Sequence, residues 1–379
     1  MLTCSPMNSS VNEALYGLLR MAVCPSCSTV SFSQKLSECE WAHLHEEALK
    51  QLLVGLLYPA ICRLPQELRP SMDLVFQWAS EAETIKGHNR LINAGAARLT
   101  ELFAKHGRKT AVLKGPANAR LYPEPNLRQA GDIDLWVEGG KDSVLALLQE
   151  MGYEIDKKDL LAHHHVDLRP VEKGISVEIH YKASSGNMNP FTDARLQRFL
   201  EKEIQPVEPV SEGFNVPSAK FALVMQLSHI QGHLFDDGIG FKQIVDYFVL
   251  LQHASAADRI EVSDQLVKTG LWHTAGALMW VLEYVLGLER SKMICDPDRR
   301  RGKKMLAEIE ECGNFGFGKA NPSEQFIVRW LKNRLRMVGL FWFAPSEVFF
   351  HELSYWKVFV KSIPLRVRLR KVSIWDEFH

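Results

Sequence analysis

One short stretch decides the fold: Gly-Asp-Ile-Asp-Leu-Trp-Val, residues 131–137. Its apolar residues predict a buried strand. Because successive side chains of a strand point to opposite faces, Asp132 and Asp134 share one face. Two like charges on a half-buried face repel each other and lose solvation, which a divalent cation would offset. The stretch therefore predicts a metal site of the kind that serves phosphate chemistry.

The composition is that of an ordinary globular protein. The 379 residues are enough for two or three domains, and 45 basic residues balance 45 acidic ones. A net charge of zero argues against an overall attraction to nucleic acid but leaves local patches open. We find no signal-peptide pattern and no apolar run of about 18 residues, so we expect no membrane span. The odd number of scattered cysteines favours reduced thiols and a cytoplasmic location.

Two other groups have the spacing of metal ligands. Cys24 and Cys27 form a C-x-x-C pair, but a structural zinc site needs four ligands and no second pair follows. We therefore expect ordinary cysteines there. Of the three consecutive histidines, His163 and His165 would share a strand face. A metal site, a substrate contact and a solvated strand start are the alternatives for them.

Helical periodicity marks the beginning of the chain. It predicts helices over residues 11–23, about 38–57 and about 71–106, and Gly107 is a suitable stop for the third. We assign residues 1–85 to an N-terminal helical region.

The pattern changes at Thr110 to alternating short strands and helices. We expect a compact α+β unit over residues 86–207. Its predicted elements are strands at 110–115 and 132–138, a short helix and proline-rich loop at 117–129, a helix at 141–152, an edge strand at 153–158, and two strands joined by a turn at 172–174.

Residues 208–379 return to helical periodicity and form a predicted C-terminal helical domain. Successive helices are expected at 219–235, 238–254, 257–270 and 274–288, followed by a charged loop at 296–304. The last sixty residues mix aromatic and basic side chains. This segment would pack as a helix, or touch nucleic acid or a membrane surface.

A third carboxylate would complete the metal site, since two-metal phosphoryl transfer usually needs one. Glu178 lies in the predicted strand Ser-Val-Glu-Ile-His at 176–180, on the face opposite Val177 and Ile179. Asp167 in the preceding strand is the competitor. We favour Glu178.

Lys114 and Gly115 end the first predicted strand and open a helix. A glycine permits close backbone approach, and the helix N-terminus offers free amides and a positive dipole end to phosphate. Lys114 and Arg128 would add positive charge near a triphosphate.

Together these residues resemble the uncharacterised nucleotidyltransferase family of bacteria, within the DNA polymerase β-like nucleotidyltransferase superfamily. The resemblance covers roughly residues 86–182, and a histidine-bearing helix and Asp246 extend it into the following part. It is carried by Leu113-Lys114-Gly115, Leu121-Tyr122-Pro123, Arg128, Gly131-Asp132-Ile133-Asp134, Gly152-Tyr153 and Glu178-Ile179-His180.

The resemblance implies a polymerase β-like core, a mixed sheet flanked by helices. It also implies transfer of a nucleoside monophosphate from an NTP to an acceptor hydroxyl with release of pyrophosphate, dependent on two Mg²⁺ ions or on Mn²⁺. Asp132 and Asp134 would bind both ions, and Glu178 would bind the catalytic one. The acceptor would be a small molecule, a sugar or a protein side chain, with nucleic acid as the less favoured partner.

Further residues enter the prediction as nucleotide contacts. His180 shares the face of Glu178, and His229 lies one helical turn from His233 on the helix where the superfamily closes over its nucleotide. Lys242 and Asp246 are also one turn apart, and we expect them to pair.

Pro116 departs from the superfamily pattern, in which serine or glycine usually follows the glycine. Proline suits the first position of a helix, but it has neither a hydroxyl nor an amide proton to offer a phosphate. The alternative hypothesis is therefore a catalytically weak or inactive nucleotide-binding regulatory module of the toxin–antitoxin or defence type.

Overall fold

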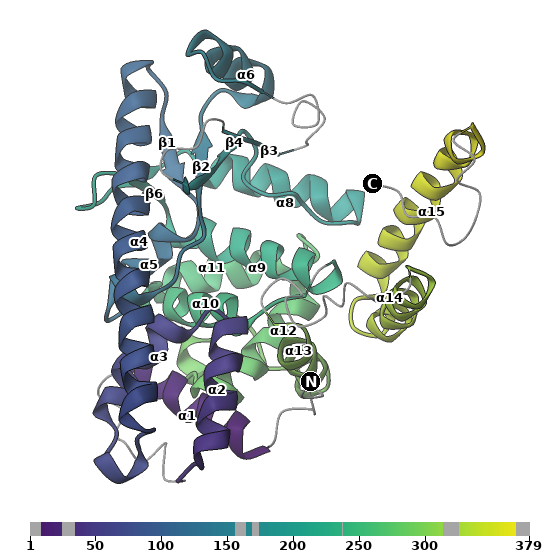
Figure 1. Cartoon of the computed structure of the whole chain (residues 1–379). Coiled ribbons are helices and arrows are strands. Elements are labelled where there is room, and N and C mark those ends of the chain that lie inside the picture. The colour runs from purple at the N-terminus through teal and green to yellow at the C-terminus, as the bar shows by residue number, and fades with distance from the viewer. Residues whose placement is uncertain are drawn as a thin grey trace.

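The computed structural model describes residues 9–24, 35–155, 164–168, 174–236, 238–313 and 326–368. Within them a small sheet is surrounded by helices, which confirms the predicted α+β class (Figure 1). Four predicted features lie outside the described residues: Cys27, His163, residues 156–158 of the edge strand, and residues 172–173 of the turn.

The main sheet is mixed, as predicted. Its strands are β1 (Thr110–Val112), β2 (Asp132–Val137), β3 (His165–Asp167) and β4 (Ser176–His180). Their order is β1-β2-β4-β3, in which β2 and β4 run parallel and the other two pairs are antiparallel. The parallel pair sets Asp134 opposite Glu178.

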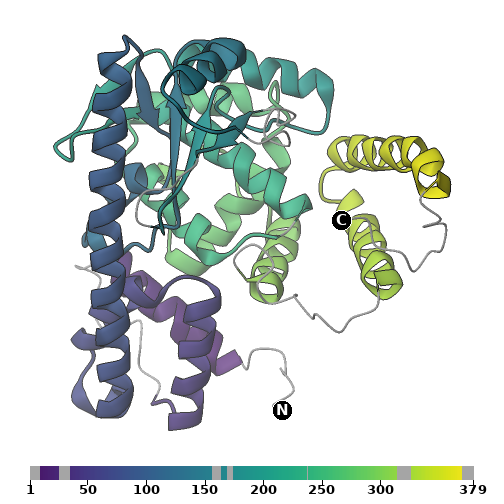
Figure 2. The same ribbon diagram turned by 45° about the horizontal axis from the view of Figure 1, so that its top comes forward.

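The two faces of the sheet differ. Ile133, Leu135 and Val137 are fully buried in a cluster that includes residues of α4 (Met72–Lys105) and α6 (Gly140–Glu150). Because side chains alternate, Asp132 and Asp134 point to the opposite face. The long helix α4 runs past the sheet and on to the first helices of the chain (Figure 2).

The first helices are α1 (Ser9–Val23), α2 (Glu38–Lys50) and α3 (Val54–Arg63). The prediction of a single helix over 38–57 was wrong, because the chain turns between α2 and α3, where Leu52 has a φ of 55°. The Gln51 side chain fixes this turn: it donates to the Ile309 carbonyl (3.0 Å) and accepts from the Phe241 amide (2.8 Å). Helix α4 and its stop at Gly107, with a φ of 70°, are as predicted.

Between β1 and β2 lie α5 (Pro116–Ala119) and the 3₁₀ turn η3 (Pro125–Leu127). After the sheet come α8 (Pro190–Glu203), a hairpin of β5 (Val207–Pro209) and β6 (Asn215–Pro217), α9 (Ala219–Phe235), α10 (Phe241–His253), α11 (Ala256–Leu266), α12 (Trp272–Val281), α13 (Arg299–Cys312), α14 (Phe326–Phe341) and α15 (Pro345–Arg368). Short turns η2 (Gln66–Leu68), η5 (Leu282–Leu286) and η6 (Arg290–Lys292) complete the description.

Four of these elements differ from the prediction. The charged loop expected at 296–304 is wrong, because Asp298 caps α13 by accepting from the Arg301 amide at 3.0 Å and Met305 and Ile309 bury its apolar side. Helix α8 and the β5–β6 hairpin were not predicted. Their signals were Asn189 as N-cap before Pro190, and a turn between two short strands.

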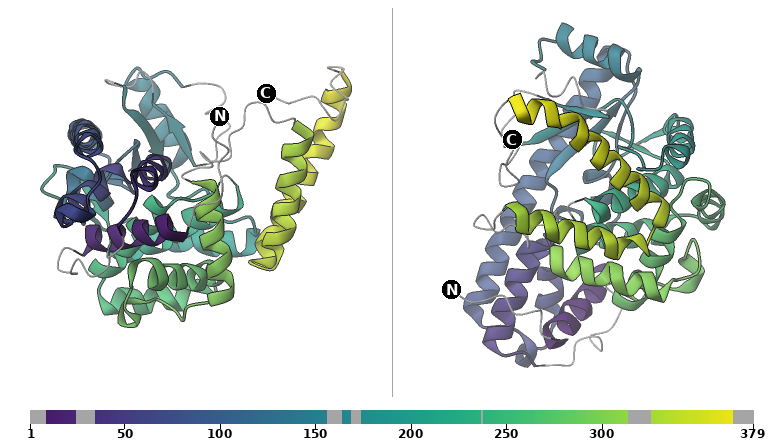
Figure 3. Two further views of the ribbon diagram at one scale, coloured as in Figure 1. Left: turned by 60° about the horizontal axis from the view of Figure 1, so that its bottom comes forward. Right: turned by 90° about the vertical axis from the view of Figure 1, so that its right-hand side faces the viewer.

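The described chain has two hydrophobic clusters. One is the sheet cluster, and the other combines residues of α1, α2 and α3 with residues of α9, α10, α12 and α13. Helices α14 and α15 lie side by side (Figure 3). The division into residues 1–85, 86–207 and 208–379 stays a prediction. None of the described helices has the length and apolarity needed to cross a membrane.

Candidate active site

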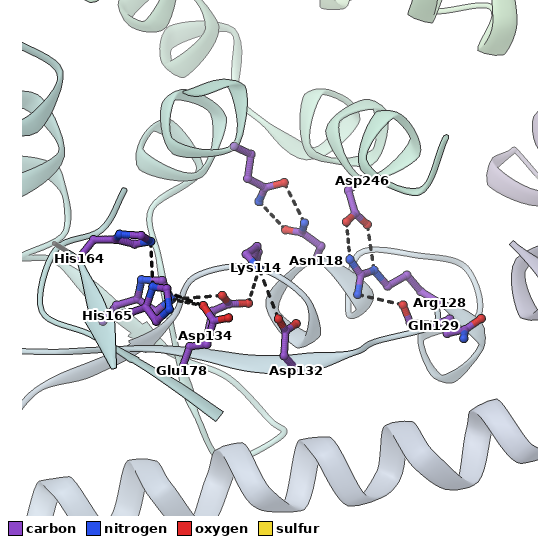
Figure 4. Close-up of polar contacts among 12 residues, drawn as sticks. Lys114, Asn118, Arg128, Gln129, Asp132, Asp134, His164, His165, Glu178 and Asp246 are labelled. Atoms are coloured by element: carbon purple, nitrogen blue, oxygen red, sulfur yellow. Dashed lines mark hydrogen bonds and ion pairs between the residues drawn. The ribbon is translucent and has the colours of Figure 1, made fainter. Parts of the chain in front are cut away.

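Three carboxylates converge on the polar face of the sheet. Asp132 and Asp134 come from β2, and the parallel register brings Glu178 of β4 beside them. One oxygen from each lies within 4.8 Å of the others (Figure 4). Asp134 is fully buried, whereas Asp132 and Glu178 are partly exposed. Asp167, the competitor, lies across from Glu178 on β3 and is not part of this group.

Lys114 supplies the balancing positive charge. Its Nζ lies 2.7 Å from Asp134 Oδ2 and 3.8 Å from Asp132 Oδ2. Burial disfavours the charged amine, but the charges of Asp134 and Asp132 outweigh burial and raise the pKa of Lys114. Burial alone would raise the pKa of Asp134, but the charge of Lys114 outweighs burial and holds this pKa well below its usual range. Burial and the charge of Asp134 raise the pKa of Asp132, although Lys114 opposes them.

His180 connects two of the carboxylates. Its side chain is 6% exposed, and its Nε2 lies 3.2 Å from Asp134 Oδ1 and 3.3 Å from Glu178 Oε2. Burial favours the neutral imidazole, but these two contacts prevail and raise the pKa of His180. His180 thus lies against the carboxylates and is not on the wall of the neighbouring cavity.

A cavity of about 250 Å³ opens beside the carboxylates. It brings together five residues that the sequence singled out for the site: Lys114, Gly115, Arg128, Asp132 and His229. Its other wall residues are Leu52, Gly131, Gln226, Ile230, Lys242, Gln243 and Asp246.

Helix α9 contributes His229 to the cavity. Its position relative to α5 is fixed by Gln226, whose amide exchanges two hydrogen bonds with that of Asn118, at 2.9 and 2.8 Å (Figure 4). Burial, reinforced by the nearby charge of Lys114, lowers the pKa of His229 well below its usual value. His229 is therefore a neutral imidazole at physiological pH.

Arg128 lies on the cavity wall, and its positive charge is paired with Asp246. Its guanidinium binds both carboxylate oxygens of Asp246, with Nε 3.0 Å from Oδ1. The Tyr122 hydroxyl donates to the same oxygen at 2.7 Å. All three groups are buried. The expected pair of Lys242 and Asp246 was wrong, because Arg128 occupies the carboxylate.

Lys242 is a cavity residue that the sequence analysis did not assign to the site. It lines the cavity, and within the described residues its ammonium forms no ion pair. Burial, together with the charge of Arg128, lowers the pKa of Lys242 to about 8. Its position one turn before Asp246 was the available signal, but that spacing predicted a pair with Asp246.

The segment after Lys114 differs from the expected phosphate-binding helix start. Gly115 has a φ of 61° and a ψ of −109°, a conformation that favours glycine. The amides of Ala117, Asn118 and Ala119 already donate to the carbonyls of Lys114 and Gly115. The prediction that these amides are free was therefore wrong, since α5 is a single tight turn that uses its own donors.

Hydrogen bonds from a side chain of α4 fix the loop that carries Arg128. The Asn89 side chain donates to the carbonyls of Asn126 (2.6 Å) and Arg128 (2.9 Å) and accepts from the Ala130 amide (3.2 Å). The buried Asn89 thus fixes residues 126–130, which lead into β2.

A family model described as "Uncharacterised nucleotidyltransferase" matches residues 37–287. The chain belongs to this family. The match includes all three carboxylates and every wall residue of the cavity. Membership confirms the family resemblance and supports nucleotidyl transfer as the general activity.

Other comparisons add little to the family assignment. The crystal structure of an antigenic nucleotidyltransferase-like protein from Paracoccidioides brasiliensis is similar with a TM-score of 0.35 and 13% sequence identity, over 55% of this chain and 95% of that chain. No curated protein gives a significant match.

The carboxylate group fits a divalent cation. All three side chains offer oxygen ligands, the type that Mg²⁺ and Mn²⁺ prefer. Asp134 is completely buried, so its negative charge requires compensation that Lys114 and His180 now provide. Asp132, Asp134 and Glu178 could therefore hold a metal ion in this member of the family.

Proposed function

We propose that this protein transfers a nucleoside monophosphate from an NTP to an acceptor hydroxyl and releases pyrophosphate, with Mg²⁺ as the required ion and Mn²⁺ as a substitute. One observation carries the proposal: Asp132, Asp134 and Glu178 converge beside a cavity that has two lysines, Lys114 and Lys242, in its wall. The carboxylates would bind a pair of cations, and the lysines would bind an anionic triphosphate.

Asp132 and Asp134 would hold two ions, and Glu178 would hold the ion nearer the acceptor. Bound there, the ions would neutralise the charge that develops on the transferred phosphoryl group. His180 would act as a positioning residue, since it holds Asp134 and Glu178 in their present orientation.

The cavity would take the triphosphate. Lys242 has no ion-pair partner among the described residues, so its ammonium would bind a phosphate oxygen without breaking an ion pair. Lys114 would exchange Asp134 for phosphate once the charge of Asp134 is balanced by a cation. Arg128 would fix the position of the cavity wall through its ion pair with Asp246. The neutral His229 would offer the nucleotide a hydrogen bond without adding a charge to the cavity.

Glu178 would also help to activate the acceptor hydroxyl. Burial opposes ionisation of Glu178, but the contact with His180 dominates and lowers the pKa of Glu178, so the carboxylate is ionised at neutral pH. An ionised, partly exposed carboxylate can accept a proton. The acceptor would be a small molecule, a sugar or a protein side chain.

The direct test is incubation of the purified protein with each α-labelled NTP, Mg²⁺ or Mn²⁺, and cell extract as a source of acceptors. We expect labelled product and pyrophosphate from the wild type and neither from Asp134→Asn. Absence of both products with all four NTPs, from protein shown to be folded, would contradict the proposal.

A second candidate is a regulatory module that binds a nucleotide without turnover. The observation that favours it is the engaged start of α5: Pro116 has no amide proton, and the next three amides donate within the turn. Calorimetry would distinguish the two, because NTP binding without any pyrophosphate over hours supports the module.

A further inference from the structure

Three histidine rings gather beside Glu178, on the side away from Asp132 (Figure 4). The antiparallel register of β3 and β4 sets His165 directly opposite His180. The ring centroids of His165 and His180 are 5.2 Å apart, and His164 lies 4.3 Å from His165 and 5.7 Å from His180. The proposed transfer reaction uses neither His164 nor His165.

The donor atoms of this group are spaced as ligands of one ion. Glu178 Oε2 lies 3.3 Å from His180 Nε2 and 3.8 Å from His165 Nδ1, and a donor from each of the three residues lies within 4.8 Å of the others. Tetrahedral zinc with bonds of 2.0–2.1 Å requires ligand atoms about 3.3 Å apart. Movements of about an ångström would therefore complete the coordination.

A metal ion at this group would replace a hydrogen bond that the rings now make. His165 Nδ1, which lies 3.8 Å from Glu178 Oε2, also lies 2.8 Å from His164 Nε2, so coordination through Nδ1 would break the contact with His164. The surroundings are negative: Asp167 Oδ1 lies 4.0 Å from His165 Nε2, and Asp134 lies 3.2 Å from His180. His165 and Glu178 are each about a quarter exposed, which gives an ion access from solvent.

We propose that His165, His180 and Glu178 form a second cation site, which takes a transition-metal ion of the Zn²⁺ type. Two imidazoles and one carboxylate are a ligand set of open zinc sites, in which a water takes the fourth position. Imidazole nitrogens select Zn²⁺ over Mg²⁺, whereas the three carboxylates select hard cations. The two sites thus differ in chemistry although they adjoin.

Glu178 belongs to both groups. An ion on the histidine side would withdraw Glu178 and His180 from Asp134. Zn²⁺ would then inhibit nucleotidyl transfer, a consequence that rests on the function proposed above. The binding of the ion itself does not depend on that function.

The experiment titrates ZnCl₂ alone into the metal-free protein by calorimetry, with and without excess Mg²⁺. We expect Zn²⁺ to bind even in excess Mg²⁺. His165→Asn should weaken the Zn²⁺ affinity at least tenfold, because loss of a metal ligand should lower the affinity no less than loss of a group that only orients a ligand. His106→Asn, an exposed histidine at the end of α4, is the matched control and should bind Zn²⁺ as the wild type does. Equal affinity of the His165 variant and the wild type would overturn the proposal, as would displacement of Zn²⁺ by Mg²⁺.

Co²⁺ provides a second measurement that needs no variant. A site with two imidazoles and one carboxylate gives the intense visible absorption of four-coordinate Co²⁺, whereas an all-oxygen octahedral site gives weak bands. Only weak bands would overturn the proposal. Neither measurement uses a nucleotide, so the second site stands or falls independently of transferase activity.

Discussion

Arg128 and Asp246 form a buried ion pair that joins the loop before β2 to helix α10, across 118 residues of sequence. Both oxygens of Asp246 are used, and the Tyr122 hydroxyl shares one of them. The pair fixes one wall of the cavity and also neutralises the arginine. The positive charge that the sequence predicts near a triphosphate is therefore already paired in the folded chain.

We expect Asp246→Asn to destabilise the protein by about 3–5 kcal/mol, because it leaves the Arg128 charge buried without its partner. Urea unfolding followed by circular dichroism measures the change. Tyr122→Phe is the matched control: it removes a single hydrogen bond to the same carboxylate and should cost about 1.5–3 kcal/mol. A smaller loss for Asp246→Asn than for Tyr122→Phe would show that the ion pair is not the main link.

The carboxylate group yields a prediction about activity. Asp132→Asn and Asp134→Asn should each reduce transfer by about 10²- to 10³-fold, the loss typical when a group that stabilises the transferred charge is removed. Rates of pyrophosphate release measure this. Asp167→Asn is the control, because Asp167 faces Glu178 across the strands but lies outside the group of three. If Asp167→Asn were as damaging, Asp167 would be the third ligand.

His180 should act through the carboxylates that it holds. We expect His180→Gln to lower the apparent affinity for Mg²⁺ by about 10- to 100-fold, as is usual for groups that orient ligands. Raising the Mg²⁺ concentration should restore most of the rate. A loss that does not respond to Mg²⁺ would mean that His180 contacts the nucleotide instead.

Lys242 makes stability depend on pH. Its pKa is lowered from 10.5 to about 8 in the folded protein, so between these values the unfolded chain binds more protons. The free energy of unfolding should therefore rise with pH across this window, and below pH 8 the full cost of burial remains. Lys242→Met should remove the rise and stabilise the protein at pH 7 by up to about 3 kcal/mol.

The control for Lys242→Met is Lys268→Met, which alters an exposed lysine and should leave the pH profile unchanged. Under the proposed function, Lys242→Met should also raise the KM for the NTP. A variant that is less stable at pH 7 would show that Lys242 has a partner in the folded protein.

Gly115 gives a test of the backbone at the cavity. Its φ of 61° is unfavourable for any side chain, so Gly115→Ala should destabilise the protein by about 1–3 kcal/mol. Thermal unfolding measures this. Gly131→Ala is the control on the same cavity wall, because a Cβ there meets no atom within 4 Å. Equal effects of the two substitutions would exclude backbone strain as the cause.

Local patterns predicted the elements that depend on local chemistry. Alternation in residues 131–137 predicted β2, and helical periodicity with Gly107 predicted α4, because one buried face is enough to define each. The turn at Leu52 was not predictable in this way. It depends on hydrogen bonds between the Gln51 side chain and the backbone of Ile309 and Phe241, far along the chain.

The same distinction applies to the site. The strand pattern put Asp132, Asp134 and Glu178 on matching faces, and the structure brings them together. The partners of Arg128 and Lys242 were not predictable, because helix α10 meets the loop before β2 only in the folded chain. A one-turn spacing favoured Lys242 and Asp246 as a pair, yet a buried guanidinium takes the carboxylate bidentately, which an ammonium cannot do.

Helix α4 limits how the molecule can be divided. Its 34 residues carry Trp78 and Ile85 in the first half and Asn89, the support of the Arg128 loop, in the second. A polypeptide that started at residue 86 would retain Asn89 but lose Trp78, which is fully buried, and would place a frayed helix end directly beside the sheet. Truncations intended to isolate the sheet and its carboxylates should therefore begin before Met72 and keep α4 whole.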